Sequence, residues 1–195
     1  LGNHMARAGF DRESRRLTTI DSLYRRVREE TPQFEPGARF SYSNSGFIVA
    51  GRIIEQVTGR PYAEVVTRRL LDPLGMTHTR FHLVDERPAD AARGYVLDGR
   101  AGARREPTVV PQPASDGGVH STLADLLLFD RALHGPGVLS EKARRLMQTP
   151  NLNGYGYGLS IKPPEEHVSG HTSVGHTGGL PDRSTVLRRF VDDEV

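Results

Sequence analysis

The spacing of apolar residues changes once along this chain, and that change constrains the fold more than any other feature. Before about residue 150, apolar side chains recur every three or four positions, which is the spacing of an amphipathic helix. One such set is Ile20, Leu23, Tyr24 and Val27. From Tyr155 onward, short apolar stretches separated by Pro and Gly turns are typical of β-strands. Helices followed by strands, without an internal repeat, predict an α+β fold, a helical region followed by a short antiparallel sheet, rather than alternating βαβ units.

Capping and turn residues set the expected limits of these elements. The predicted helices span residues 19–30, 44–58, 62–71 and 123–133, and a further helix begins after Ser140. The predicted strands span residues 157–162, 173–177 and 184–191, and a short strand is expected around Tyr95 within the long irregular segment 77–115. We therefore expect a single partial domain over 1–195, mainly helical over 1–150 and forming the sheet over 151–195.

Composition excludes several classes of function. The 195 residues carry a formal net charge of only +2, and basic residues are scattered among nearly as many acidic ones, so no nucleic acid partner is expected. No apolar run approaches the roughly 20 residues of a membrane-spanning helix, so no membrane segment is expected. The chain has no cysteine, which excludes disulfides and thiolate chemistry but does not fix a compartment.

Histidine pairs are the only hint of metal binding. His78 and His82 are four residues apart, and His171 and His176 are five apart. No cysteine or carboxylate completes a recognised ligand spacing around them, and no phosphate-binding loop is present. We therefore predict neither a metal nor a cofactor.

The sequence Tyr-Ser-Asn at residues 42–44 opens a helical pattern. A tyrosine has a free pKa of about 10 and becomes a useful base only where a cation or an oriented hydrogen bond stabilises its phenolate. Asn44 can either cap the helix or present its amide to a substrate carbonyl. A helix cap that follows an aromatic packing residue is the alternative interpretation.

The sequence His-Thr-Gly-Gly at residues 176–179 lies in a predicted strand. An edge strand can donate a backbone N–H to a developing oxyanion, and glycines allow a substrate to approach the backbone closely. A turn with a solvent-exposed histidine is the alternative.

Together with their surroundings, these motifs resemble the serine β-lactamase and penicillin-binding-protein family, in particular its class C-like esterases and D-alanyl carboxypeptidases. The similarity extends over about residues 34–193 and implies an incomplete β-lactamase/transpeptidase-like fold. The segments that carry it are Phe34-x-Pro-Gly, Phe40-Ser41-Tyr42-Ser43-Asn44, Val57-Thr58-Gly59-Arg60-Pro61-Tyr62, Pro73-Leu74-Gly75-Met76-x-x-Thr79 and Gly175-His176-Thr177-Gly178-Gly179.

The resemblance also implies roles for individual residues. Tyr42 would relay protons during formation and breakdown of an acyl-enzyme, and the Gly179 N–H would be one half of the oxyanion hole. His176 would bind or steer the substrate or assist proton transfer. The implied catalytic residues are Tyr42, Asn44, His176 and Gly179, and the implied substrate-binding residues are Asn44, His176, Thr177 and Gly178.

The family's nucleophile motif, Ser-x-x-Lys, is absent from these 195 residues. The only lysines are Lys142 and Lys162, and leucines occupy the positions three residues before them. We expect that the chain begins just after the nucleophile segment and ends before the last strand and helix of the fold. The isolated chain is therefore predicted to be inactive.

Three hypotheses follow. The chain is part of a serine hydrolase acting on an ester or amide, such as a β-lactam, D-alanyl peptide or carboxylester; or it is a catalytically dead module that binds a peptide or ester ligand; or it is a subunit completed by another chain. The expected partners are accordingly a small-molecule substrate and either a second chain or a missing N-terminal segment. If the first hypothesis holds, the Tyr42 hydroxyl and the Gly179 nitrogen should lie within about 10 Å of each other, with Asn44 and His176 lining the same cleft.

Overall fold

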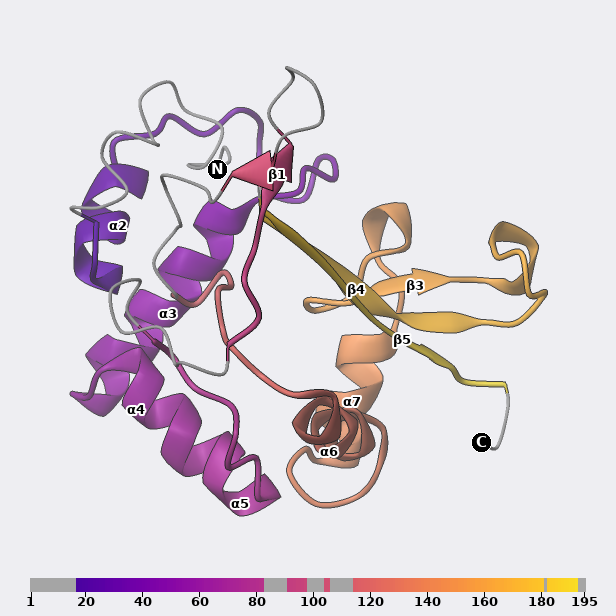
Figure 1. The fold of residues 1–195 in the computed structure, drawn as a ribbon. Coiled ribbons are helices and arrows are strands. Elements are labelled where there is room, and N and C mark those ends of the chain that lie inside the picture. The colour runs from indigo at the N-terminus through magenta and orange to yellow at the C-terminus, as the bar shows by residue number, and fades with distance from the viewer. Residues whose placement is uncertain (1–16, 83–90, 98–103, 106–113, 181, 193–195) are drawn as a thin grey trace. The chain divides into compact units, whose positions relative to one another are not determined.

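The computed structural model describes residues 17–82, 91–97, 104–105, 114–180 and 182–192 (Figure 1). The chain divides into two compact units, Leu1–Thr122 and Leu123–Val195, which we call unit 1 and unit 2. This boundary groups the two later helices with the sheet, whereas the change in periodicity predicts a division at residue 150. The single-domain organisation stays a prediction.

Two helices form the framework of unit 1: α2 (Ile20–Val27) and α3 (Asn44–Thr58). Thr19 caps α2, because its hydroxyl accepts a hydrogen bond from the Ser22 N–H at 3.1 Å. The helix ends three residues earlier than predicted, since Glu30 N–H bonds to the Val27 carbonyl in a turn. The buried cluster between the helices comprises Ile20, Leu23, Val27, Ile48 and Ala114.

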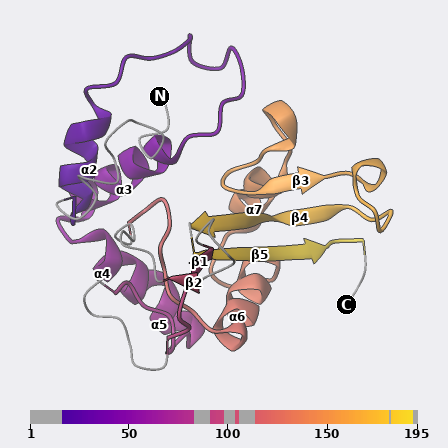
Figure 2. The same ribbon diagram turned by 45° about the horizontal axis from the view of Figure 1, so that its top comes forward.

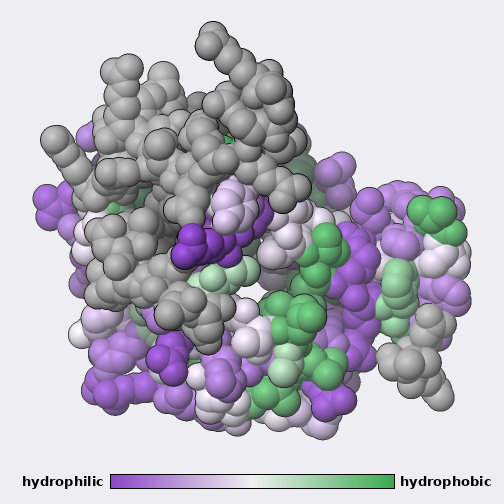
Figure 3. All heavy atoms as spheres, viewed as in Figure 1, coloured by the Kyte–Doolittle hydropathy of each residue, from purple (hydrophilic) through white to green (hydrophobic). Residues whose placement is uncertain are grey.

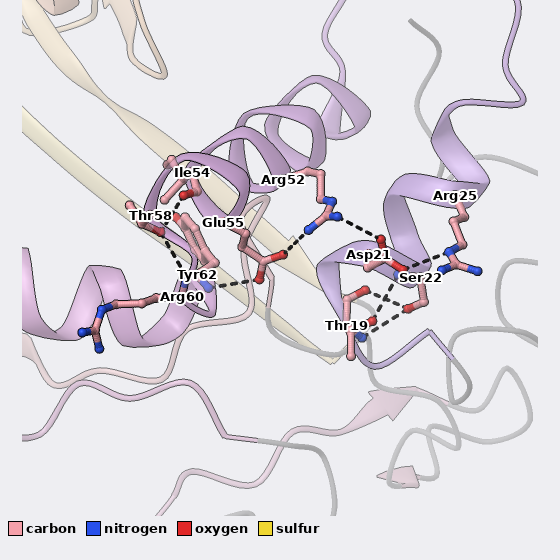
Figure 4. A network of polar contacts seen from close by, with 10 residues as sticks. All are labelled: Thr19, Asp21, Ser22, Arg25, Arg52, Ile54, Glu55, Thr58, Arg60 and Tyr62. Atoms are coloured by element: carbon pink, nitrogen blue, oxygen red, sulfur yellow. Dashed lines mark hydrogen bonds and ion pairs between the residues drawn. The ribbon is translucent and has the colours of Figure 1, made fainter.

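A polar network connects α3 to both of its neighbours (Figure 4). Arg52 pairs with Asp21 on α2 at 3.4 Å and with Glu55 on its own helix at 3.5 Å. Glu55 in turn accepts a hydrogen bond from the backbone N–H of Tyr62 at 3.1 Å. These contacts fix α3 between α2 and the helix that begins at Tyr62.

That next helix runs past Leu71, where it was predicted to end. It runs through α4 (Tyr62–Val66), a π-helical turn (Thr67–Leu71) and α5 (Asp72–Leu74). In the π turn the Asp72 N–H bonds to the Thr67 carbonyl five residues back, so the ordinary spacing is already broken where the proline enters. Gly75, with a φ of 69°, ends the helix instead, and the Met76 N–H bonds back to the Leu71 carbonyl.

The described part of the irregular segment contains a short strand pair, β1 (Val96–Leu97) and β2 (Arg104–Arg105). The strand expected around Tyr95 is thus confirmed one residue further on. Most of the rest of this segment lies outside the described residues. At its end, Ala114 and Gly117 exchange backbone hydrogen bonds of 2.9 and 3.3 Å around a two-residue turn.

Unit 2 packs two helices against a three-stranded antiparallel sheet (Figure 2). The helices are α6 (Leu123–His134) and α7 (Glu141–Gln148), the second capped by Ser140. The strands are β3 (Ser160–Lys162), β4 (Ser173–Leu180) and β5 (Arg183–Phe190), in the order β3-β4-β5. The first strand is three residues shorter at its start than predicted.

An apolar cluster and an ion pair hold the sheet of unit 2 to its helices. The buried cluster comprises Leu133, Leu159, Ile161 and Val174. The guanidinium of Arg189 on β5 binds the carboxylate of Asp130 on α6 through Nε, at 3.0 Å, and through its terminal nitrogen. Asp130 is buried and also lies 3.3 Å from His134 Nδ1. Figure 3 shows apolar side chains reaching the surface over α6, where Leu123 and Leu127 are exposed.

These two units confirm the predicted mixed fold of helices with a small antiparallel sheet. Within the described ranges no helix is both long and apolar enough to span a membrane. In the same part of the chain, no group of three or more His, Asp or Glu side chains is arranged to hold a metal ion.

Candidate active site

The Tyr-Ser-Asn motif lies at the start of α3, as the sequence predicts. Ser43 has extended backbone angles, and its hydroxyl accepts a hydrogen bond from the Gly46 N–H at 3.2 Å. Ser43, not Asn44, is therefore the helix cap. Asn44 is the first helical residue, and its side-chain oxygen accepts a hydrogen bond from the Tyr42 hydroxyl at 3.2 Å.

This geometry decides one alternative for Asn44. The capping role is wrong, because Ser43 performs it with a better-placed hydroxyl. The side-chain amide of Asn44 is instead directed toward the Tyr42 hydroxyl. The two motif side chains thus lie together at the helix start, and Tyr42 is 42% exposed.

Asp116 is a further ionisable group whose charge acts on this motif. Burial raises the pKa of the Asp116 carboxyl to about 6, although a hydrogen bond from its own backbone opposes the shift. Burial also raises the pKa of Tyr42, and the negative charge of Asp116 raises it further. Tyr62 is affected in the same two ways. Burial and the Asp116 charge therefore both favour the protonated form of the Tyr42 phenol.

A close contact with α3 holds the turn that carries Asp116. The turn's Ser115 lies directly over Gly51, and a Cβ added at Gly51 would come within 2.2 Å of the Ser115 hydroxyl oxygen. Ala114 is part of the buried cluster beside Ile48, and Tyr62 packs against that cluster. Asp116 is thus fixed relative to the helix that Tyr42 precedes.

The His-Thr-Gly-Gly motif lies in the second half of β4. On one side β4 pairs with β5 along its whole length, and Gly179 is opposite Ser184. On the other side β3 pairs only with Ser173, Val174 and Gly175. Within the described residues, no strand pairs with this edge of β4 beyond Gly175.

The direction of the β4 N–H groups follows from the ladder. Val191 N–H donates to the Thr172 carbonyl, which makes this pair a hydrogen-bonded one. Because hydrogen-bonded and non-hydrogen-bonded pairs alternate in an antiparallel ladder, every second residue from Ser173 to Gly179 directs its N–H away from β5. The N–H groups of Thr177 and Gly179 therefore point to the edge that β3 does not cover.

The side chain of His176 is held from within unit 2. Its Nε2 lies 2.6 Å from the hydroxyl of Tyr155, and the two rings meet edge to face with centroids 5.9 Å apart. Both residues are partly buried. The alternative of a solvent-exposed histidine in a turn is therefore wrong, because His176 is a strand residue with a specific partner.

The structure thus brings the predicted residues together in two groups. Tyr42 and Asn44 meet in unit 1, and the residues from His176 to Gly179 follow one another along one strand of unit 2. A cleft between Tyr42 and Gly179 stays a prediction.

Sequence reasoning did not single out Tyr155 or Asp116 as site residues. Tyr155 is 21 positions before His176, in the segment Tyr155-Gly156-Tyr157-Gly158, where no spacing rule distinguishes one tyrosine from the other. Asp116 directly precedes Gly117-Gly118, which is a local signal for a turn but not for a catalytic group.

Comparison with known proteins agrees with these motifs. A family model described as Beta-lactamase matches residues 1–193, and the chain belongs to this family. It is 31% identical over 183 residues to Penicillin-binding protein 4* of Bacillus subtilis (strain 168), which covers 82% of this chain and 39% of that protein. The chain spans about two fifths of the length of the curated relatives it matches.

Solved structures show the same fold. A penicillin-binding protein from Bacillus halodurans superimposes with a TM-score of 0.81 at 26% identity, covering 90% of this chain and 56% of that one. A D-stereospecific amidohydrolase from Streptomyces sp. gives the same TM-score and identity, with 98% of this chain and 61% of that chain covered. The fold is therefore a partial β-lactamase/transpeptidase-like fold, and the chain resembles serine hydrolases.

Proposed function

We propose that this chain supplies the general-base and oxyanion-binding parts of a serine hydrolase that cleaves ester or amide bonds through an acyl-enzyme. The observation that carries the proposal is the edge of β4 beyond Gly175, with which no strand in the described part of the chain pairs. A backbone N–H stabilises an oxyanion only if the ladder does not already use it, and the N–H of Gly179 points away from β5 to an edge that β3 does not reach. Gly178 and Gly179 add no side chain there, so a substrate carbonyl can approach.

In this proposal Tyr42 relays protons, which requires a phenolate that is accessible near neutral pH. Its phenol donates to Asn44 Oδ1, and the Asp116 charge raises its pKa. A cation beside the hydroxyl would act in the opposite direction and make the phenolate accessible. In the resembled family this cation is the lysine of Ser-x-x-Lys, a motif that these 195 residues lack. The chain alone therefore has neither the nucleophile nor the group that would activate its base.

The similar proteins indicate the general class of the substrate. A penicillin-binding protein and a D-stereospecific amidohydrolase are both similar to this chain. Acyl transfer from an amide, an ester or a β-lactam uses the same nucleophile, base and oxyanion donors. We therefore assign a small acyl-bearing substrate of one of these kinds.

Covalent labelling tests this function. The isolated chain, incubated with a fluorophosphonate or a labelled penicillin, should give no stoichiometric adduct in intact-mass spectrometry. Joining a Ser-x-x-Lys nucleophile segment of the resembled family upstream should produce one adduct and ester hydrolysis, and a matched fusion with the motif serine replaced by alanine should give neither. An adduct on the isolated chain would contradict the proposal.

The same experiment separates the alternatives. If the fused chain stays inactive but either form binds an ester or peptide ligand reversibly, the catalytically dead binding module is correct. If mixing the isolated chain with a separate nucleophile-bearing chain restores activity, the chain is a subunit completed in trans.

A second measurement tests the cleft. Because the chain has no cysteine, Ser41→Cys provides a single site for a spin label, one residue before Tyr42. If Tyr42 and Gly179 face each other, the label should broaden the Gly179 amide signal, and reduction of the label should restore it. An unchanged Gly179 signal would place the two motifs apart and remove the shared-site mechanism.

A further inference from the structure

A short polar contact joins Tyr155 to the motif residue His176. Both groups belong to unit 2, so the contact does not depend on the rest of the chain. The hydroxyl-to-Nε2 distance is 2.6 Å. This is shorter than the 2.7–3.2 Å typical of an N–H donor on an oxygen and matches an O–H donor. A phenol is also the more acidic partner, so the Tyr155 hydroxyl donates and Nε2 accepts.

Backbone contacts hold Tyr155 in the position from which it makes this hydrogen bond. The Tyr155 N–H bonds to the Leu152 carbonyl at 3.3 Å, and its carbonyl accepts from the Asn151 N–H at 3.1 Å. The next residue, Gly156, is packed so closely on α7 that an added Cβ would lie 2.1 Å from the Met147 carbonyl oxygen. His176 is fixed in turn by its place in β4 opposite Leu187. Both partners are therefore held by secondary structure before the side chains meet.

We propose that Tyr155 is a positioning residue for His176, holding the imidazole as the Nδ1–H tautomer by occupying the Nε2 lone pair. In a neutral imidazole one nitrogen carries the proton and the other accepts, and the bond made by one nitrogen sets the state of the other. The tautomer is thus a property of unit 2 and needs no ligand.

This tautomer narrows the role left open for His176. With Nε2 accepting from Tyr155, the ring can take a proton there only if that hydrogen bond reverses its direction. In this tautomer Nδ1 carries the N–H. Resting on the proposed function, His176 therefore acts as a hydrogen-bond donor rather than as a general base.

Nitrogen chemical shifts of the imidazole test the assignment on the isolated chain. Long-range ¹H–¹⁵N correlation at pH 8 should show a pyrrole-like Nδ1 and a pyridine-like Nε2 for His176. Tyr155→Phe keeps the ring contact and removes only the hydroxyl, so His176 should shift toward the Nε2–H tautomer that neutral imidazoles favour in water. The matched control is Tyr157→Phe, because Tyr157 is two residues away and 67% exposed, and its loss should leave the His176 shifts unchanged.

A protonated Nε2 in the unmodified chain, or the same tautomer with and without the Tyr155 hydroxyl, would overturn the inference. The spectrum of the unmodified chain decides the first point even if the variant folds poorly. Neither outcome depends on acylation, so this inference and the proposed hydrolase activity fail separately.

Discussion

The two motif regions differ in how completely the chain prepares them for chemistry. His176 has a hydrogen-bond partner within its own unit, and the N–H of Gly179 is directed by the sheet. The pKa of Tyr42, the proposed base, is raised by burial and further by the Asp116 carboxylate. A neutral N–H donor can bind an oxyanion, whereas a phenolate needs a cation or an oriented hydrogen bond. Under the proposed function, unit 2 therefore directs its half of the oxyanion hole by itself, while the Tyr42 base still needs a group that lowers its pKa.

The largest expected effect comes from removing the Tyr42 hydroxyl in the fusion that carries Ser-x-x-Lys, which tests the proposed role of Tyr42. Tyr42→Phe should lower kcat by about 10²- to 10⁴-fold, since a proton relay is lost while the ring is kept. Steady-state ester hydrolysis and a thermal melt would check this. Tyr95→Phe is the matched control, because Tyr95 has a similar exposure of 45%, and its kcat should not change. An unchanged kcat in Tyr42→Phe would exclude Tyr42 from the mechanism.

The packing of the sheet on the helices in unit 2 depends on the ion pair between Arg189 on β5 and Asp130 on α6. Asp130→Ala should destabilise the chain by about 3 kcal/mol, because it leaves the partly buried Arg189 guanidinium without its carboxylate. Urea denaturation would measure the loss. Asp21→Ala in unit 1 breaks its ion pairs with Arg25 and Arg52, and because all three side chains are between 32% and 75% exposed, the change should cost about 1 kcal/mol or less. Equal losses in the free energy of unfolding would contradict this, because they would show that the buried pair in unit 2 stabilises the chain no more than the exposed pairs in unit 1.

A third prediction concerns the charge beside Tyr42. The pKa of Asp116 is raised from 3.8 to about 6, so the folded chain binds a proton more tightly than the unfolded chain does. The ionised carboxylate therefore costs stability in full above pH 6, the cost shrinks as the pH falls from 6 to 3.8, and it vanishes below that. A shift of about two pKa units corresponds to about 3 kcal/mol at most.

Asp116→Asn should therefore stabilise the chain by up to about 3 kcal/mol at pH 8 and by almost nothing at pH 4. It should also lower the pKa of Tyr42, because the negative charge that raises it is gone. Urea denaturation across this pH range and ultraviolet titration of tyrosine would measure the two effects. Glu35→Gln removes an exposed carboxyl as control. A stability difference that does not depend on pH would contradict the electrostatic explanation.

The sequence predicted those features whose signals are local. Both ends of α3 were predicted correctly, because Ser43-Asn44 marks the start and Gly59, at a φ of 66°, marks the end. The end predicted for the next helix, Leu71, is three residues too early, since a preceding π turn lets Pro73 follow without ending the helix. The choice between Ser43 and Asn44 as cap required coordinates, because both residue types cap helices well.

Site features that depend on tertiary packing were beyond sequence reasoning. The Tyr155 hydroxyl reaches His176 only because a turn and a strand from different segments meet. Likewise, the pKa of Asp116 depends on burial, which motif spacing does not reveal. The residue types in a motif thus predict which groups take part, whereas the groups that tune them are set by packing.

The smallest expected effect tests whether the Asp116 turn is fixed on α3. Gly51→Ala places a methyl group 2.2 Å from the Ser115 hydroxyl oxygen and 2.5 Å from its Cβ, so it should destabilise the chain by about 1 to 3 kcal/mol despite the better helix propensity of alanine. Ser115→Gly removes both of those atoms, and the buried hydroxyl it deletes has no hydrogen-bond partner in the described part of the chain. The double variant should therefore recover at least about 1 kcal/mol relative to the sum of the two single changes, a coupling that urea denaturation can resolve. Gly46→Ala on the same helix meets no atom within 4 Å and should be neutral or stabilising. Additive losses at Gly51 and Ser115 would mean that the turn is not held by this contact, and that the charge beside Tyr42 is free to move away from it.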